Sequence, residues 1–147
     1  MSTRWGNFNQ DLIEDMRANG GRPTSGPFKG RDVLILHTTG AKSGEARETP
    51  LAYFPENGHY LIIASKGGAP TNPSWYHNLA THPKATIEVL GETILVKARI
   101  TAGDERDGLF AKIGAKYPGF LGYQEKTSRV IPVIDLEPLE QSPLVAR

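Results

Sequence analysis

The chain has 147 residues, which suits a single domain with its own hydrophobic core. Hydrophobic residues make up 38% and charged residues 22%, so the composition is that of a globular protein and excludes a disordered chain. The net charge of +1 argues against a broad nucleic-acid-binding surface, and the absence of cysteine excludes disulfides and thiolate metal sites.

Membrane insertion and secretion find no support in the sequence. No stretch approaches the roughly 20 apolar residues of a membrane span. The first six residues lack the apolar core of a signal peptide, so we expect a cytoplasmic protein.

The chain begins with a predicted helix within residues 1–20. Asn7 and Gln10 resemble a capping pair, and they precede a stripe of apolar residues at helical spacing, formed by Leu12, Ile13 and Met16. Residues 20–31 are rich in glycine and proline and predict a loop.

Strand candidates dominate the rest of the chain. They cover residues 32–39, 47–54, 59–65, 84–90, 93–101 and 130–136. Short turns such as Asn57-Gly58 connect most of them as hairpins.

Two further helices are expected over residues 73–81 and 103–115. The first would have Asn72 as its N-cap and Pro73 at its first helical position. Hairpin-linked strands with inserted helices predict an α+β fold, a closed or partly closed barrel of about six mostly antiparallel strands with three to four helices. We expect one domain over residues 1–147, with a loosely held tail over 138–147.

A loop with glycines and cations lies between the first two predicted strands, over Gly40–Arg47. Glycine permits backbone geometries in which amide N–H groups converge, and Lys42, Ser43 and Arg47 add two cations and a hydroxyl donor. Such a loop suits a phosphate or carboxylate ligand. An ordinary solvated hairpin turn would have the same composition.

A second loop, Ser65–Asn78, also pairs glycines with a cation and leads into a predicted helix N-terminus, which favours anions. It carries Trp75 and Tyr76, which are suited to covering a flat ring. The alternative for Trp75 is a core residue that anchors a short helix.

Other kinds of site find little support. The histidines at 37, 59, 77 and 82 do not have the spacing of a metal site on one helix, so we expect no metal. The chain has no Gly-x-Ser-x-Gly elbow of a hydrolase, and the Gly40 loop is not a Walker motif.

Several motifs in order resemble the deazaflavin-dependent nitroreductase family of split-barrel oxidoreductases. They are Thr39-Gly40-Ala41-Lys42-Ser43-Gly44 with Arg47 and Pro50-Leu51, Ala64-Ser65-Lys66-Gly67-Gly68-Ala69-Pro70, Asn72-Pro73-Ser74-Trp75-Tyr76-His77-Asn78-Leu79, Tyr117-Pro118, Tyr123-Gln124 and Arg129-Val130-Ile131-Pro132-Val133. The resemblance extends over residues 19 to 138 without large gaps.

The resemblance implies a split barrel that binds coenzyme F-420, a deazaflavin with a phosphate and an acidic tail. Its reduced form gives a hydride to quinones, nitroaromatics or unsaturated lactones in relatives. The implied cofactor-binding residues are Ala41, Lys42, Ser43, Arg47, Glu48, Thr49, Pro50, Leu51, Ala52, Ile63, Ala64, Ser65, Lys66, Ser74, Trp75, Tyr76, His77, Asn78 and Phe120. Alternatives are an FMN-dependent barrel enzyme and a deazaflavin-binding protein without turnover.

The same resemblance places the acceptor near Tyr117 and Tyr123, with Ser65 as a third candidate catalytic residue. Ala52 and Phe120 stand where the family's nitroreductase has tyrosines, so we expect a roomier and less polar pocket for flat, largely apolar acceptors. A lipid quinone as acceptor would place the protein at the membrane periphery. The sequence indicates no oligomeric state.

Overall fold

The computed structural model describes residues 4–139, with side chains from residue 8 onward. The helices are α1 (Arg4–Ala18), the 3-10 turn η1 (Lys66–Gly68), α2 (Ser74–Thr81), α3 (Gly103–Lys116) and α4 (Gly119–Glu125). The strands are β1 (Val33–Thr39), β2 (Ala46–Ala52), β3 (Phe54–Glu56), β4 (His59–Ile63), β5 (Lys84–Val89), β6 (Glu92–Ile100) and β7 (Val133–Pro138). None of the helices in this part of the chain is both long and apolar enough to cross a membrane.

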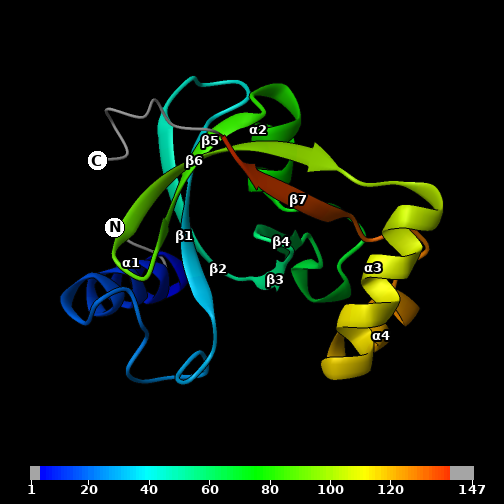
Figure 1. The fold of residues 1–147 in the computed structure, drawn as a ribbon, viewed down its shortest axis with the longest axis horizontal. Helices are drawn as coiled ribbons and strands as arrows, with labels where there is room; N and C mark the ends of the chain where they lie inside the picture. The colour runs from blue at the N-terminus through cyan, green and yellow to red at the C-terminus, as the bar shows by residue number, and fades with distance from the viewer. Residues whose placement is uncertain (1–3, 140–147) are drawn as a thin grey trace.

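All strands belong to one antiparallel sheet in the order β2-β1-β5-β6-β7-β4-β3. β2 and β3 occupy the two ends of this order, yet only Tyr53 separates them in the sequence. The sheet must therefore curl until its two ends approach each other, and Figure 1 shows this half-barrel. The amide of Tyr53 donates to the Asp32 carbonyl at 3.1 Å, which fixes the corner.

The core lies on both sides of β1, which explains its unbroken run of apolar residues. Leu34 and Leu36 face the barrel interior with side chains of the other strands, whereas Val33 and Ile35 face outward. The apolar stripe of α1 covers this outer face with Leu12, Ile13 and Met16. A strand buried on both faces reads as continuously hydrophobic and not as alternating.

A separate apolar cluster attaches α3 and α4 to the far end of the sheet, on the side away from α1 (Figure 1). Phe110 and Ile113 of α3 pack there against Leu61, Ile131 and Val133. The two helices meet closely, because a β-carbon on Gly114 would overlap the side chain of Leu121. This second cluster fixes the position of the tyrosine segment after α3.

The predicted barrel is confirmed, and residues 4–139 contain seven strands and four α-helices. The extra strand arises because β2 stops at Ala52 and the chain turns at Tyr53 before β3 begins. The Asn57-Gly58 turn is confirmed, since both residues have positive φ, at 52° and 81°. Of the predicted tail, Pro138 ends β7 and the Leu139 amide donates to the Leu95 carbonyl, while residues 140–147 lie outside the described part.

Two predicted helix caps are wrong. α1 already begins at Arg4, so Asn7 lies inside the helix, and Gln10 bonds Glu14 one turn later. α2 begins at Ser74 with Pro73 as its N-cap, and no side chain caps it. Asn72 accepts a hydrogen bond from Arg129 instead, and this tertiary contact replaces the local one.

An ion-pair cluster holds α1 on the sheet. The Arg17 guanidinium donates to Glu88 at 2.6 Å and to Glu48 at 2.7 Å, and the His37 ring lies 2.5 Å from Glu88. The Arg17 hydrogen bonds hold the pKa of Glu88 below its ordinary value, although burial opposes them and His37 adds to them.

We predict that Glu88→Gln lowers the free energy of unfolding near neutral pH by about 1 kcal/mol, which appears as a lower melting temperature. A carboxyl whose pKa is lowered by folding stabilises the protein above its unfolded pKa and loses that contribution as pH falls through the folded value. The difference in stability between the wild type and the variant should therefore shrink below about pH 4.5, the ordinary pKa of a glutamate carboxyl.

Thermal melts of both proteins from pH 7 to pH 3 measure this effect. Glu92→Gln is the control, because the exposed Glu92 has no ion-pair partner within residues 4–139. If Glu88→Gln lowers the stability equally at pH 7 and at pH 3, the ionised Glu88 carboxylate is not what stabilises the fold.

Candidate functional site

The loop between β1 and β2 is closed by its own hydrogen bonds. The Gly40 amide donates to the Glu45 carbonyl at 2.8 Å, and the Gly44 amide donates to the Gly40 carbonyl at 2.9 Å. The Glu45 amide donates to Ser43 Oγ. A β-carbon on Gly40 would overlap Ser43 Oγ, so a larger residue here would force the Ser43 hydroxyl to move.

Asn78 of α2 fastens this loop to the barrel. Its Oδ1 accepts from the Ala41 amide at 2.9 Å, and its Nδ2 donates to Thr38 Oγ1 at 3.2 Å. The Asn78 side chain is buried. The expected convergence of loop amides on a ligand is therefore only partial, because four of them already have protein acceptors.

A hollow of about 380 Å³ lies between this loop and the start of α2. It is lined by Gly40, Ala41, Lys42, Ser43, Arg47, Ser74, His77 and Asn78. Arg47 meets only the exposed Glu45, at 3.3 Å, and within the described residues the Lys42 ammonium has no ion-pair partner. Two available cations and a helix N-terminus beside hydroxyl donors suit an anionic group.

The second loop is held by Arg129. Its guanidinium donates to the Ser65 carbonyl at 2.9 Å, the Ala69 carbonyl at 2.9 Å and Asn72 Oδ1 at 2.7 Å. Burial lowers the pKa of Arg129. One planar side chain thus fixes three points of the loop between β4 and α2.

Arg129 belongs to a longer polar network. Gln124 of α4 donates to the Arg129 carbonyl at 2.7 Å and accepts from the buried Arg106 of α3 at 2.8 Å. Arg106 also donates to the Ile131 carbonyl. The loop lies directly on α4, because a β-carbon on Gly68 would be 2.8 Å from the Tyr123 carbonyl oxygen. Loop, helices and the approach to β7 therefore form one unit.

An aromatic cluster lies beside this unit. The ring of Phe54 is 5.2 Å from that of Tyr117 and 5.6 Å from that of Phe120, and Tyr123 follows at 5.9 Å from Phe120. Tyr117, Phe120 and Tyr123 line a hollow of about 270 Å³. Tyr117 and Phe120 line a smaller one of about 30 Å³ with Ala52. The four positions that the resemblance gave to the acceptor therefore lie together.

The structure divides the predicted run 48–52 between two faces of the sheet. Thr49 and Leu51 pair with the inward-facing Leu36 and Leu34, so they face the barrel interior. Glu48 lies outside, bonded to Arg17 and His37, and Pro50 pairs with the outward-facing Ile35.

Several other predicted residues are largely buried. Trp75 belongs to the main core cluster, with 7% of its surface exposed. This burial agrees with the alternative interpretation of Trp75 as a core residue that anchors a short helix. Ile63 and Ala64 are also buried. Ser65, Lys66 and Tyr76 are more accessible, but they are not among the residues that line the 380 Å³ hollow.

His37, Glu48 and Glu88 bring three ligand atoms within 4.8 Å of one another, a geometry compatible with a cation. The sequence did not predict that these residues are neighbours, because they belong to three different strands. Arg17 already donates to both carboxylates and supplies the positive charge there.

Sequence reasoning missed three residues that shape the site: Arg31, Arg106 and Arg129. Arg129 belongs to one of the family motifs but was given no role, and Arg106 lies within the predicted helix over residues 103–115. Arg31 follows the Gly- and Pro-rich loop and lies over the ring of Tyr117, at 5.4 Å from its centroid. No local sequence pattern predicts which residues these three arginines contact, because most of the contacted residues are far away along the chain.

The curled antiparallel sheet, with one glycine-rich loop after β1 and another after β4, defines a split barrel. The model of the family described as F420H(2)-dependent quinone reductase matches residues 10–138, and the chain belongs to this family.

Individual relatives agree with this assignment. The F420H(2)-dependent quinone reductase Rv1261c of Mycobacterium tuberculosis is 41% identical over 106 residues, which are 70% of this chain and 71% of that protein. A solved structure of an F420-H2 dependent reductase, FDR-A, is 40% identical with a TM-score of 0.66, covering 73% of this chain and 95% of that one. A structure described as a domain-swapped dimer is 34% identical with a TM-score of 0.68, covering 90% and 97%.

We predict that Arg129→Lys loosens the second loop, because one ammonium cannot reach three separated oxygens at once. The amides of Gly68 and Ala69, which donate to the Ser65 and Lys66 carbonyls, report on the loop. Their hydrogen exchange should accelerate at least about tenfold, and affinity for coenzyme F-420 should fall.

Arg99→Lys is the matched control, because Arg99 bonds Glu105 and Asp135 on the outside of the sheet. Unchanged exchange at Gly68 and Ala69 in the Arg129 variant would show that the loop is held by other contacts.

Proposed function

We propose that this protein is an oxidoreductase that binds reduced coenzyme F-420 and reduces quinones. Family membership supports the activity, and the observation that carries the proposal is the pairing of a cationic hollow with an aromatic pocket on one half-barrel. The first suits the anionic parts of a deazaflavin cofactor, and the second suits a flat acceptor.

The residues present fit this cofactor. Lys42 and Arg47 would hold its phosphate and acidic tail, with donors from Ser43, Ser74 and His77 at the same hollow. Ser65 and Lys66 would hold the ring through a loop that Arg129 keeps in shape. The positive φ of Lys66, at 47°, is a conformation that only a well-fixed loop maintains in a residue other than glycine.

When bound, reduced coenzyme F-420 supplies a hydride. The chain's own contribution is to bind, orient and protonate. Asn78 and Arg129 set the two loops, and the aromatic cluster places the acceptor. The Tyr123 hydroxyl, the Ser65 hydroxyl or water would give the acceptor its proton. No covalent bond to a protein side chain is needed.

Titrations with coenzyme F-420 and with FMN test the cofactor, followed by steady-state oxidation of the reduced cofactor with a soluble quinone. We predict tighter binding of coenzyme F-420, weakened by added salt, and quinone-dependent turnover. Equal or tighter binding of FMN would favour the FMN-dependent alternative. Binding without turnover would indicate a deazaflavin-binding protein.

The same titration tests the cationic hollow. Arg47→Ala should weaken binding of coenzyme F-420 by about 1.5–3 kcal/mol, the usual scale for hydrogen bonds to charged groups. Folding should change little, because the Arg47 side chain is 54% exposed and, among the described residues, forms an ion pair only with Glu45. Lys97→Ala removes an exposed cation from the other side of the sheet and is the control. A collapse of thermal stability with unchanged affinity would make Arg47 structural.

Tyr123→Phe tests the acceptor side. We predict that quinone turnover falls about tenfold, because the variant loses a proton donor, while affinity for coenzyme F-420 stays within about twofold. Tyr60→Phe is the control, since Tyr60 packs against Tyr53 outside the pocket. An unchanged rate for the double variant Tyr117→Phe with Tyr123→Phe would remove both phenols from the reaction.

A further inference from the structure

The hollow beside Tyr117 has an unusual charge. Of the residues that line this 270 Å³ space, the charged ones are Arg31 and Lys116, both cations. The neighbouring Asp32 lines the smaller hollow and, with Lys116 and Tyr117, a further hollow of about 250 Å³, but not this one. An aromatic pocket with two cations and no carboxylate is not simply apolar, as the sequence had indicated.

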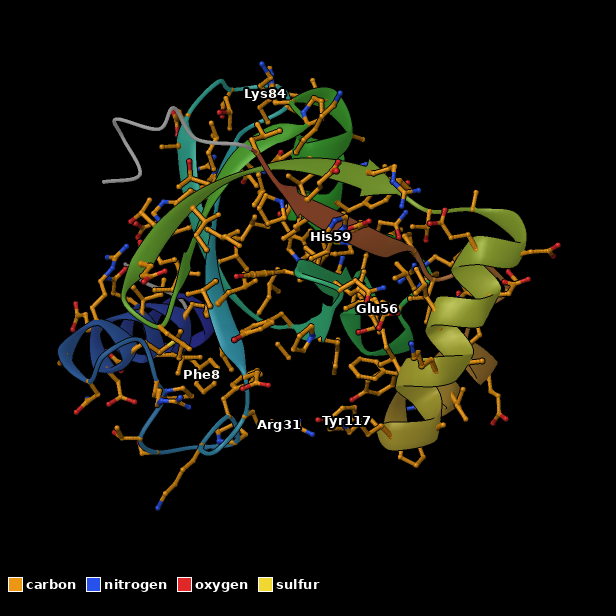
Figure 2. All side chains as sticks on the ribbon, in the orientation of Figure 1. Phe8, Arg31, Glu56, His59, Lys84 and Tyr117 are labelled. Atoms are coloured by element: carbon orange, nitrogen blue, oxygen red, sulfur yellow. The ribbon has the colours of Figure 1, made fainter. Side chains whose placement is uncertain are left out.

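Both cations are available for a ligand. Within the described residues, neither the Arg31 guanidinium nor the Lys116 ammonium forms an ion pair. Arg31 contacts the face of Tyr117 instead, with its Cζ 5.4 Å from the ring centroid, and Figure 2 shows the two labelled side chains next to each other. The guanidinium and the Tyr117 ring therefore lie together in the wall of this hollow.

We propose that this pocket selects quinones that carry an ionised oxygen on the ring, such as hydroxyquinone anions. The planar ring would lie against the aromatic cluster, and its delocalised negative charge would face Arg31 and Lys116. This inference rests on the proposed function and specifies the class of acceptor.

The chemistry balances with such an acceptor. The quinone takes up one hydride and one proton, its two carbonyls become hydroxyls, and the reduced cofactor becomes oxidised. The ionised ring oxygen accepts no hydride, so its charge serves recognition; once the carbonyls are reduced it loses its delocalisation and takes one further proton from water. A fixed cation also stabilises negative charge on the ring oxygens during hydride transfer.

The pair 2-hydroxy-1,4-naphthoquinone and 2-methoxy-1,4-naphthoquinone separates charge from shape, because only the first ionises at neutral pH. The measurement is kcat/KM for both acceptors with the wild type, Arg31→Met, Lys116→Met and the control Lys84→Met. Lys84 lies at the opposite end of the molecule from Arg31 in Figure 2. Ratios between variants cancel the intrinsic reactivity of the two quinones.

We expect Arg31→Met to lower kcat/KM for the hydroxyquinone at least fivefold, with the methoxyquinone changed less than twofold. Lys116→Met should act in the same direction, and Lys84→Met should change neither value. Equal losses for both quinones, or no loss, in the Arg31 variant would overturn the proposal. Thermal melts confirm that each variant is folded.

A binding titration without cofactor distinguishes this proposal from the proposed function. Calorimetry with the hydroxyquinone should show affinity for the wild type that falls at least fivefold in Arg31→Met. If that difference is present but neither quinone is reduced, the pocket stands and the proposed function fails. If both quinones are reduced but Arg31→Met leaves binding unchanged, the proposed function stands and this inference fails.

Discussion

The proposed site depends on three hydrogen bonds that the Arg129 guanidinium donates to the loop between β4 and α2. The loop contains three successive residues with positive φ, of which Gly67 and Gly68 adopt it freely, whereas in Lys66 this conformation is strained and is favoured by support from outside the loop. Arg129 bonds acceptors at its beginning, middle and end. Gln124 and Arg106 then tie Arg129 to α4 and α3. The helices that carry the aromatic pocket and the loop that would hold the deazaflavin therefore cannot move independently.

The distribution of charge separates structural cations from cations available to ligands. Arg17 and Arg99 are each engaged by two carboxylates, and these contacts raise the pKa of both guanidinium groups. Lys42 and Lys116 have no ion-pair partner in the described part of the chain. A net charge of +1 hides this contrast, because it averages over neutralised clusters and over loops with an excess of positive charge.

The barrel explains how two loops distant in sequence would serve one cofactor in the proposed site. Asn78 binds the Gly40 loop from α2, while Asn72, a few residues earlier, receives Arg129. Residues 72–78, which include the end of the loop after β4 and the first part of α2, thus contact both the Gly40 loop and Arg129. The outer face of β1 has a different task, since α1 covers it and Arg17 anchors the helix through Glu88.

The sequence by itself determined the class of fold, the strand hairpins, the helical stripe of α1 and the two glycine–cation loops, because these depend on short-range periodicity and on turn residues. It also predicted, through family resemblance, that Tyr117, Phe120, Tyr123 and Ala52 line one acceptor pocket, which stays a prediction. It could not divide residues 48–52 between the faces of β2 or show that Asn72 bonds Arg129 and not its own helix. Only the tertiary structure decided these points, together with the place of Arg31 over Tyr117. The reason is physical: such contacts join residues that are distant along the chain, and their geometry exists only after the sheet has curled.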